Sequence, residues 1–591
     1  MEDHIVLKNG AGQDAIASGA EPGIEPSQSQ QQSPISKGSN TTLVDASGGS
    51  DACDSKSPTP VQVSGQEIEY LFLNFSTHLP APSALPGSRS DKPALPEPPD
   101  LKPYTSPFEW PNTRKYVITM LACTVTVLSA AAAGCYSPPE AELTVAWGIS
   151  GVVYNIGITI FTFGFAIAPM VSAPFSEING RRPMFIASGI LFVVCQIGCG
   201  VTRSFPGMIL ARFFLGVGGS TFSTIVGGII SDIYHTKDRN TPMALFSTAA
   251  LFGTGLGPLV AGVIVKHTSW RWVYYAQAIE AAVILVAIIL FFKETRGSVL
   301  LSRKAKVLNK WYEELENAGC PGLDIPVSED SEKKRCQRIR WKVKSDEERE
   351  SLLNMLSISL YRPFHLLVTE PVVFFFSLWV SFSWAVLYLQ FGSIPLVFQN
   401  NHGFDIAQSS AVFTSISVGA IIAFFISTGQ EKIAKKLGMM PTTPEGRLYF
   451  VCVESILMPA GMFWFGWTSG PSTHWIWPAL AVGCATIGIF SIYLAVFNYL
   501  ADTYHRYASS ALAAQSCCRN LLGGAFPLVT RAMYNNLGYP EASSLLGGIG
   551  SLLTIVPWVL AFFGPKIRAR SKFASVRQVA QAHLNLSGEV N

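Results

Sequence analysis

The chain has 591 residues, of which 49% are hydrophobic and only 14% are charged. Soluble domains carry about 25% charged residues, and the mean hydropathy of this chain is +0.30, so most of it is not expected to face water. The formal net charge of +3 is too small to indicate a nucleic-acid partner. The eleven cysteines form no CxxC pair or metal knuckle, so we expect neither a disulfide framework nor a bound metal.

Residues 1–113 are rich in Ser, Gln, Pro and Gly. Such a composition cannot bury enough apolar surface to offset the entropy of the chain, and it predicts a disordered cytoplasmic tail. The short apolar run Ile68–Phe75 is either a docking segment or a chance cluster. Residues 1–110 contain no apolar segment long enough for a cleavable signal peptide, so the first spanning helix is expected to direct insertion.

Twelve apolar stretches follow, each close to the roughly 20 residues that a helix needs to cross a bilayer. They lie at about 116–135, 153–172, 184–202, 208–230, 244–265, 272–292, 371–392, 409–428, 448–467, 476–497, 509–530 and 543–564. They predict an all-α polytopic membrane protein with two six-helix halves, residues 114–295 and 369–566. A cytoplasmic central loop, 296–368, joins the halves, and a cytoplasmic tail, 567–591, ends the chain.

Lysine and arginine gather on one side of the predicted membrane. The loop at residues 173–183, the central loop and the tail are basic, whereas residues 137–151 and 394–407 contain no Lys or Arg. Basic loops stay in the cytosol, so both termini are predicted to be cytoplasmic. The membrane in which the protein is expected to lie is the plasma membrane.

The two halves share a weak repeat. Asp232-Ile-Tyr-His ends the fourth span and Asp502-Thr-Tyr-His ends the tenth, and each is followed 25 or 26 residues later by Pro-Leu-Val, at Pro258 and Pro527. Parallel repeats of six helices are a known plan of transporters.

The loop between the second and third spans reads Ala-Pro-Phe-Ser-Glu-Ile-Asn-Gly-Arg-Arg-Pro. A glycine turn with one acid and two arginines can clamp helix ends, and Asp232 is placed to pair with Arg181. We interpret Glu177, Gly180, Arg181, Arg182 and Asp232 as a gate on the cytosolic side. The alternative is a simple positive-inside anchor.

The fifth span contains Gly253, Gly257, Pro258 and Gly262. Small residues four apart let helix backbones approach closely, and a proline removes a hydrogen bond and bends the helix. These residues predict a bent, closely packed contact at which the two halves move.

These segments resemble the major facilitator superfamily, and within it the fungal drug:proton antiporter branch that includes polyamine and multidrug exporters. The resemblance covers about residues 108–575: the 173–183 loop looks like motif A, Leu210–Gly218 like motif B, and residues 253–262 like motif C, which is associated with antiporters. It implies a rocker-switch fold whose first, second, fourth, fifth, seventh, eighth, tenth and eleventh spans line a central cavity. It also implies a role for Arg212 in proton coupling.

Charges inside the spans are costly and therefore candidates for function. Arg212 and Arg519 fall in cavity spans, where Arg519 either binds substrate or pairs with a helix-end carbonyl. Glu280 and Glu454 fall in peripheral spans, where they are either protonation sites or contacts of neighbouring polar groups. No cavity span carries an Asp or Glu before its cytosolic end, which favours a neutral or anionic cargo over a polyamine.

Aromatic residues are frequent in the cavity spans, as expected for apolar or planar cargo, although helix packing also needs them. The candidate cavity residues, besides Arg519, are Tyr154, Phe161, Trp379, Trp384, Tyr388, Phe490 and Tyr493.

The predicted function is proton-coupled efflux of a small organic molecule, a secondary metabolite, toxin or drug, from a fungal cell. Its expected partners are that substrate, protons and the lipid bilayer, and it is expected to act as a monomer without cofactor. The alternatives are a polyamine exporter or an organic-acid or nutrient transporter. A non-transporting sensor is disfavoured by the composition of the tail. An enzyme is disfavoured because no HExxH, His-rich box or GxSxG in a suitable context is present.

Overall fold

A computed structural model describes residues 67–82, 96–235, 238–318, 320, 322–326, 334–347, 352–436, 444–504, 507–571 and 573–574. Much of the predicted tail, residues 1–66 and 83–95, and the C-terminal residues 575–591 lie outside these ranges.

The first half contains six long helices: α1 (Asn112–Gly134), α3 (Gly151–Asn179), α4 (Arg181–Val201), α5 (Phe205–Ile233), α6 (Asn240–His267) and α7 (Arg271–Phe291). A short helix, α2 (Glu140–Trp147), lies between α1 and α3. Each of the six long helices coincides with one predicted span, and α3, α5 and α6 extend beyond it at both ends.

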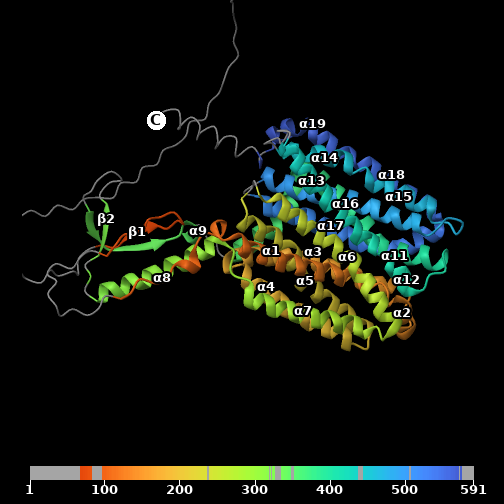
Figure 1. The fold of residues 1–591 in the computed structure, drawn as a ribbon, viewed down its shortest axis with the longest axis horizontal. Coiled ribbons are helices and arrows are strands. Elements are labelled where there is room, and N and C mark those ends of the chain that lie inside the picture. Colours follow the sequence, from red (N-terminus) through yellow and green to blue (C-terminus); the bar gives the residue numbers. More distant parts are fainter. Residues whose placement is uncertain are drawn as a thin grey trace, which may run out of the picture. The chain divides into compact units, whose positions relative to one another are not determined.

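The second half begins with α11 (Pro371–Asn400) and continues through α12 (Ile406–Ala411), α13 (Thr414–Lys436), α14 (Leu448–Glu454), α15 (Leu457–Thr468), α16 (Ile476–Tyr504), α17 (Ala508–Leu537), α18 (Tyr539–Leu553) and α19 (Ile555–Arg570). The pairs α12–α13, α14–α15 and α18–α19 each correspond to one predicted span. Together the two halves form an all-helical bundle (Figure 1), which confirms the predicted fold class.

Among the described residues, eleven helical segments are long and apolar enough to cross a membrane. Of the twelve predicted spans, the one that does not meet this criterion is the eleventh, which is occupied by α17. It has 30 residues, about 45 Å at 1.5 Å per residue, but it carries Gln515, Arg519 and Asn520. All three side chains are buried. These three polar side chains of α17 therefore face the protein and not lipid.

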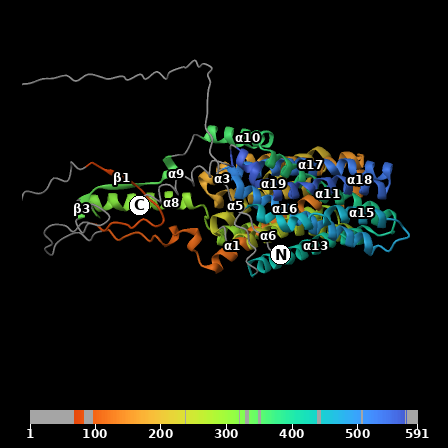
Figure 2. The same cartoon turned by 90° about the horizontal axis from the view of Figure 1, so that it is seen from above.

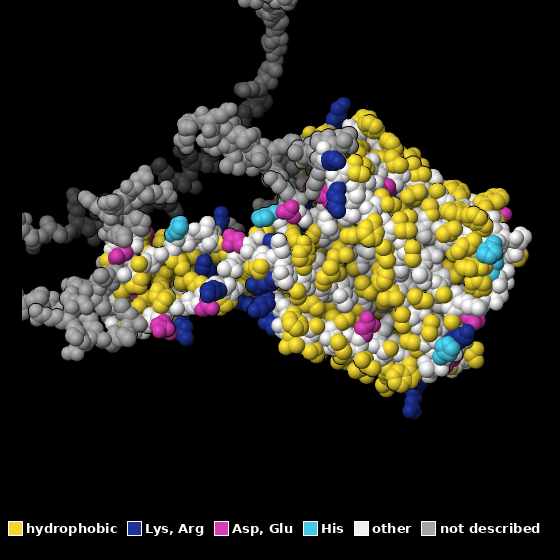
Figure 3. All heavy atoms as spheres, in the orientation of Figure 1, with side chains coloured by type: hydrophobic (Ala, Val, Ile, Leu, Met, Phe, Trp, Pro, Cys, Tyr) yellow, Lys and Arg dark blue, Asp and Glu magenta, His cyan; other side chains and the backbone are white. Residues whose placement is uncertain are grey.

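The two halves meet along two sets of helices. α3 packs against α17, and α6 packs against α12 and α13. Hydrophobic side chains cover most of the visible face of the bundle (Figure 3), as expected for a surface in contact with lipid.

The central segment differs from the predicted loop. It contains α8 (Gly297–Asn317), β2 (Leu323–Pro326), β3 (Lys334–Gln337), β4 (Ile339–Lys342), α9 (Lys344–Glu347) and α10 (Leu352–Thr369). α10 packs against α3 and α17 and lies along the bundle (Figure 2).

The predicted disordered tail also differs, because part of it pairs with the central segment. Strand β1 (Glu69–Phe72) pairs in parallel with β4, so the run Ile68–Phe75 is a docking segment and not a chance cluster. The polar composition of the tail did not indicate that it contributes to a small hydrophobic core. In this core Leu73 packs with buried residues of α8 and β4: Ala305, Leu308, Tyr312, Leu315, Ile339 and Trp341. We call this unit of β1–β4 and α8 the strand subdomain.

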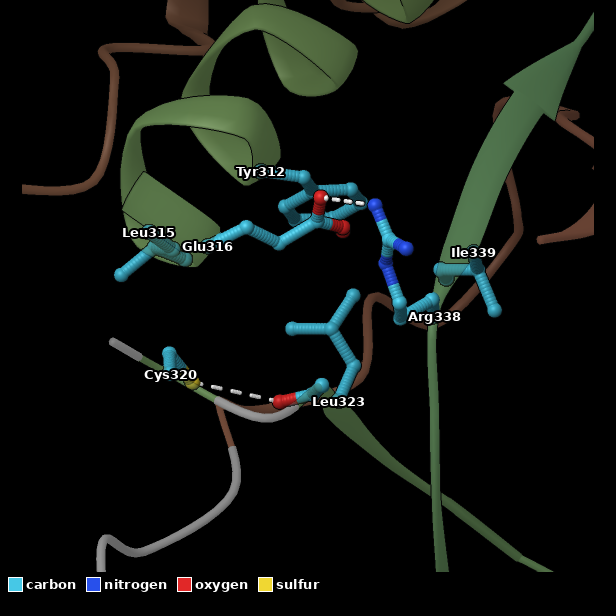
Figure 4. Close-up of a pocket in the computed structure, with 8 residues that line it drawn as sticks. Tyr312, Leu315, Glu316, Cys320, Leu323, Arg338 and Ile339 are labelled. Atoms are coloured by element: carbon cyan, nitrogen blue, oxygen red, sulfur yellow. Dashed lines mark hydrogen bonds and ion pairs between the residues drawn. The ribbon is translucent and has the colours of Figure 1, made fainter. Parts of the chain in front are cut away.

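Glu316 at the end of α8 joins that helix to the strands. Its carboxylate accepts hydrogen bonds from Arg340 Nη1 at 2.7 Å and Nη2 at 3.0 Å, and from Arg338 Nη2 at 2.7 Å. Figure 4 shows Arg338 extending from the start of β4 toward this carboxylate. Burial alone would raise the pKa of Glu316, but the hydrogen bonds and charges of the two arginines lower it to about 2.

Glu316→Gln is expected to loosen the strand subdomain, because the charged acceptor of both arginines is lost. Charged hydrogen bonds contribute about 1.5–3 kcal/mol, reduced here by partial exposure, so amide exchange in α8 and β4 is expected to rise on the order of tenfold. Hydrogen–deuterium exchange at neutral pH measures this rise. Because the pKa of Glu316 is lowered in the folded protein, the stabilisation by its carboxylate is fully present at neutral pH and is lost as the pH falls toward about 2.

Glu313→Gln is the matched control. Glu313 lies on the same helix, is 61% exposed, and its carboxylate is 3.8 Å from Arg340 Nε. Equal exchange in the two variants would contradict the role assigned to Glu316.

Candidate functional site

A buried charge cluster lies where α3 and α5 end and α4 begins. Arg181 Nε is 3.1 Å from Asp232 Oδ2, and Arg296 Nη1 is 3.2 Å from Asp232 Oδ1. Arg181 Nη1 donates to Ser176 Oγ at 2.6 Å. The side chains of Arg181 and Asp232 are only 6% and 9% exposed. We call this set the Asp232 cluster, and the end of the bundle that carries it the Asp232 end.

The start of α4 is held by an acid that sequence reasoning did not assign. Glu294 Oε1 accepts from the backbone N–H of Arg181 at 2.8 Å and of Arg296 at 3.0 Å, and Oε2 accepts from that of Arg182 at 3.3 Å. Gly180 has a φ of 102°, and a Cβ there would lie 2.1 Å from Glu294 Oε2. A side chain at position 180 is therefore excluded both by the backbone conformation and by this carboxylate.

The other two predicted members lie at the edge of the cluster. Glu177 is half-buried and forms no ion pair with another described residue, although its charge acts on Arg296. Arg182 turns away, and its Nη2 donates to the carbonyl of Ile289 at 2.8 Å. Of the two acids predicted for the gate, Asp232 forms the expected ion pair with Arg181, whereas the contacts to the start of α4 come from Glu294 and not from Glu177. The signal in the sequence was an acid directly after the sixth span.

The second half repeats the arrangement at the end of α16. Arg447, from the 3-10 turn η3 (Pro444–Arg447), places Nε 2.6 Å from Asp502 Oδ2, as Arg181 does with Asp232. Asp502 also binds Arg239 Nη2 at 2.8 Å, and Arg239 belongs to the first half. Asn240 adds a second link between the halves, because its Nδ2 donates to Glu431 Oε2 at 2.8 Å. The halves are therefore tied together at the Asp232 end.

The halves also touch nearer the opposite end. Ser137 Oγ donates to the carbonyl of Phe391 at 2.7 Å, and Thr159 Oγ1 to that of Gly524 at 2.8 Å. Lys266 Nζ lies 2.6 Å from Asp405 Oδ2 in an exposed pair. Both ends of the interface between the halves are thus bridged in this structure.

The glycines of α6 bring it into backbone contact with two helices. A Cβ on Gly253 or Gly257 would lie 2.3 Å from the carbonyl oxygens of Val127 and Ala131 in α1. A Cβ on Gly262 would lie 2.1 Å from Ser410 Oγ in α12, a helix of the other half.

Pro258 lies inside α6 and faces α1, because its Cδ is 2.7 Å from the position of a Cβ on Gly134. Gly255, between Gly253 and Gly257, faces the second half instead, because a Cβ there would lie 2.6 Å from the carbonyl oxygen of Phe413. Helix α6 therefore packs against its own half and against the other half with different faces of the same stretch.

Arg212 is enclosed within the first half. It is 1% exposed, Nη1 donates to the carbonyl of Ala132 at 2.7 Å and Nε to that of Gly157 at 3.3 Å. Its guanidinium lies over the rings of Tyr136 at 4.5 Å and Phe161 at 4.6 Å.

Tyr154 supports this arrangement. It stacks on Tyr136 with ring centroids 4.3 Å apart and donates to the carbonyl of that residue at 2.7 Å. Two of the predicted cavity aromatics, Tyr154 and Phe161, therefore belong to the surroundings of Arg212.

Arg519 lies in the second half and has far fewer partners. It is 2% exposed, and its guanidinium lies over the rings of Trp384 at 4.5 Å and Tyr493 at 4.9 Å. Its only hydrogen bond to a described residue runs from Nη2 to Ser516 Oγ at 3.5 Å, while Nε and Nη1 have no acceptor there.

The remaining predicted cavity aromatics also belong to the second half. Tyr388 lies next to Trp384, with ring centroids 6.3 Å apart, and Trp379 and Phe490 are fully buried. The aromatic candidates thus include one group around Arg212 and a second group, Trp384, Tyr388 and Tyr493, beside Arg519.

The two predicted protonation sites lie away from both arginines. Glu280 is exposed on α7, and Glu454 is half-buried and accepts a hydrogen bond from Gln430 Nε2. Neither forms an ion pair with Arg212 or Arg519 in the described part of the chain.

Residues 122–527 match the Major Facilitator Superfamily. The chain is 33% identical over 473 residues to the MFS-type transporter paaT of Penicillium rubens, covering 79% of this chain and 82% of that one. It is 35% identical over 420 residues to the efflux pump atB of Aspergillus terreus, covering 70% and 83%. With the major facilitator superfamily multidrug transporter mdrA of Aspergillus fumigatus it shares 33% over 476 residues, covering 80% and 74%.

Among solved structures, the partially occluded inward-open xylose transporter XylE from E. coli superposes with a TM-score of 0.51 at 14% identity, covering 76% of this chain and 97% of that one. This likeness supports the fold alone.

Proposed function

This chain belongs to the major facilitator superfamily of membrane transporters, and we propose that it is a proton-coupled efflux pump for a small organic molecule. The class of cargo is a secondary metabolite, toxin or drug. The observation that carries the proposal is the contact of α6 with both halves through Gly253, Gly257 and Gly262. The similarity to relatives named as an efflux pump and a multidrug transporter supports the direction of transport.

Alternating access requires that the links at the two ends form and break in turn. The links between the halves at the Asp232 end involve partly exposed groups, with 16% and 15% exposure for Arg239 and Asp502. Lys266 and Asp405 near the other end are 43% and 41% exposed. Exposed ion pairs contribute about 0–1 kcal/mol, so the link between Lys266 and Asp405 is weak enough to open during a transport cycle.

Arg181 and Asp232 of the Asp232 cluster both belong to the first half and are more deeply buried, with 6% and 9% exposure, so this pair moves as one piece with that half. We place the Asp232 end in the cytosol of the cell, with the protein acting as a monomer in the plasma membrane. The basic loops at this end support that orientation. Arg212 is the candidate for proton coupling, through its fully buried charge beside α1 and α3.

The test uses purified full-length protein in vesicles that carry an imposed proton gradient. Accumulation of a candidate cargo inside inverted vesicles with an acidic interior is the expected result, and it disappears when an ionophore collapses the gradient. Protein-free vesicles are the control.

The cargo itself is sought by comparing metabolites in cells and medium of a deletion strain. Unchanged export of every candidate, or uptake driven in the opposite direction, would rule out the efflux proposal. Loss of polyamine tolerance alone would favour a polyamine exporter.

A further inference from the structure

The charge of Arg519 forms no ion pair with a residue that the structure describes. A guanidinium stays protonated under all ordinary conditions, and an unpaired buried charge costs several kcal/mol. Yet Arg519 is 2% exposed, and two of its three nitrogens have no acceptor among the described residues. The faces of Trp384 and Tyr493 compensate part of this charge, because cation–π contacts contribute about 2 kcal/mol when desolvated.

Arg212 provides the comparison. It is equally buried, but its Nε and Nη1 donate to two main-chain carbonyls, so its charge is held by the fold. Arg519 has no such carbonyls within the described structure. The two arginines therefore differ in how many of their donors the fold satisfies. Only Nη2 of Arg212 has no acceptor among the described residues, whereas both Nε and Nη1 of Arg519 are available to a bound molecule.

The neighbourhood of Arg519 supplies further unpaired polar groups and no acid. Ser381 lies one turn before Trp384 on the same face of α11, and its buried hydroxyl has no partner among the described residues. Gln515 lies one turn before Arg519 on α17, and its Oε1 is likewise buried and without a partner. Neither α11 nor α17 contains a single Asp or Glu.

Tyr388 on α11 extends the aromatic surface beside Arg519, because its ring lies next to that of Trp384 with centroids 6.3 Å apart. A buried guanidinium without a neighbouring carboxylate on α11 or α17 creates a positive potential in a low-dielectric interior, which favours an anion and repels a cation.

We propose that Arg519 is the anion-binding residue of the cargo site, and that the cargo is an organic acid bound as its carboxylate with an apolar or aromatic skeleton. The carboxylate accepts from the free Nε and Nη1 of Arg519. The skeleton lies against the aromatic side chains of Trp384, Tyr388 and Tyr493. This assignment rests on the proposed transport function and names the class of its cargo.

Equilibrium binding tests this assignment without requiring transport. The probes are 2-naphthoate and its neutral methyl ester, titrated into the purified full-length protein and followed by tryptophan fluorescence. The wild type is expected to bind the acid at least tenfold more tightly than the ester. Arg519→Gln is expected to weaken binding of the acid about 10- to 100-fold, as charged hydrogen bonds dictate, and to leave binding of the ester unchanged. Arg519→Lys, which keeps the charge, is expected to restore part of the affinity.

The matched control is Arg271→Gln. Arg271 is also an arginine over a tryptophan, 4.4 Å from the ring of Trp270, but its Nη1 already donates to the carbonyls of Gly200 and Thr202. This variant is expected to bind the acid as the wild type does. Equal or tighter binding of the ester by the wild type, absence of binding of the acid, or unchanged affinity in Arg519→Gln would overturn the assignment.

The outcome is separable from that of the proposed function. Gradient-driven export of the neutral ester by both wild type and Arg519→Gln, without preference for the acid, leaves efflux standing and removes the anion site. Selective binding of the acid by a protein that exports nothing confirms the anion site and contradicts the efflux proposal.

Discussion

Gly257→Val is expected to prevent most of the protein from reaching its folded state. A Cβ at this position would lie 2.3 Å from the carbonyl oxygen and 2.9 Å from the Cα of Ala131. Both atoms belong to the backbone of α1 and cannot turn aside as a flexible side chain would. Forcing extra carbon atoms into a packed interior costs about 1–3 kcal/mol and occasionally more, which lowers the ratio of folded to unfolded protein by about 10- to 100-fold.

The measurement is the yield of monodisperse protein after detergent extraction, followed by the midpoint of thermal unfolding. Gly548→Val is the matched control, because Gly548 also lies in a helix of the bundle, α18, and nothing lies within 4 Å of an added Cβ. Gly257→Ala is expected to fall between the two. Similar yields for the Gly257 and Gly548 variants would mean that α1 and α6 do not pack as described.

The sequence predicted the membrane helices well because their signal is local. A stretch of about 20 apolar residues is sufficient to identify a span, and each predicted span coincides with a helix or a helix pair. Helix α17 shows the limit of this signal. Its polar residues make it too hydrophilic to be identified as a membrane span from composition. Its burial against α11 and α3 explains how it lies in the bundle.

The strand subdomain was missed because its stabilising contacts are distant in sequence. Tyr70 on β1 is opposite Arg340 on β4, 270 positions later, and neither segment has enough apolar residues to indicate a core alone. The run Ile68–Phe75 carried the signal, but its partner could not be identified before the fold was known.

The candidate site likewise contains residues that could be assigned from the sequence and residues that could not. Asp232 and Arg181 could be paired because both lie at predicted helix ends on one side of the membrane. The position of Glu294 directly after the sixth span was the one signal in the sequence, but its role could not be assigned, since it accepts hydrogen bonds from main-chain N–H groups, which every residue except proline offers. Arg212 and Arg519 were both recognised as costly charges, whereas the carbonyl partners that distinguish them are visible only in three dimensions.

Asp232→Asn is expected to be the most damaging single change of charge in the bundle. The substitution keeps the shape of the side chain and removes the negative charge shared by Arg181 and Arg296. Removing one partner of a buried pair costs about 3–5 kcal/mol, because the other charge stays buried without compensation. The expected results are a lower thermal midpoint and, if the transport proposal holds, at least a tenfold loss of export.

Asp405→Asn is the control for this prediction. It also removes an aspartate paired with a basic residue, Lys266 at 2.6 Å, but the two side chains are 41% and 43% exposed, so the expected cost is below about 1 kcal/mol. The double variant Arg181→Gln with Asp232→Asn separates charge from contact, because it removes both buried charges. If the Asp232 cluster acts through charge compensation, the double variant recovers part of the stability that Asp232→Asn loses. If it is no more stable than the single variant, the loss arises from the hydrogen bonds of Asp232 and not from the uncompensated charge of Arg181.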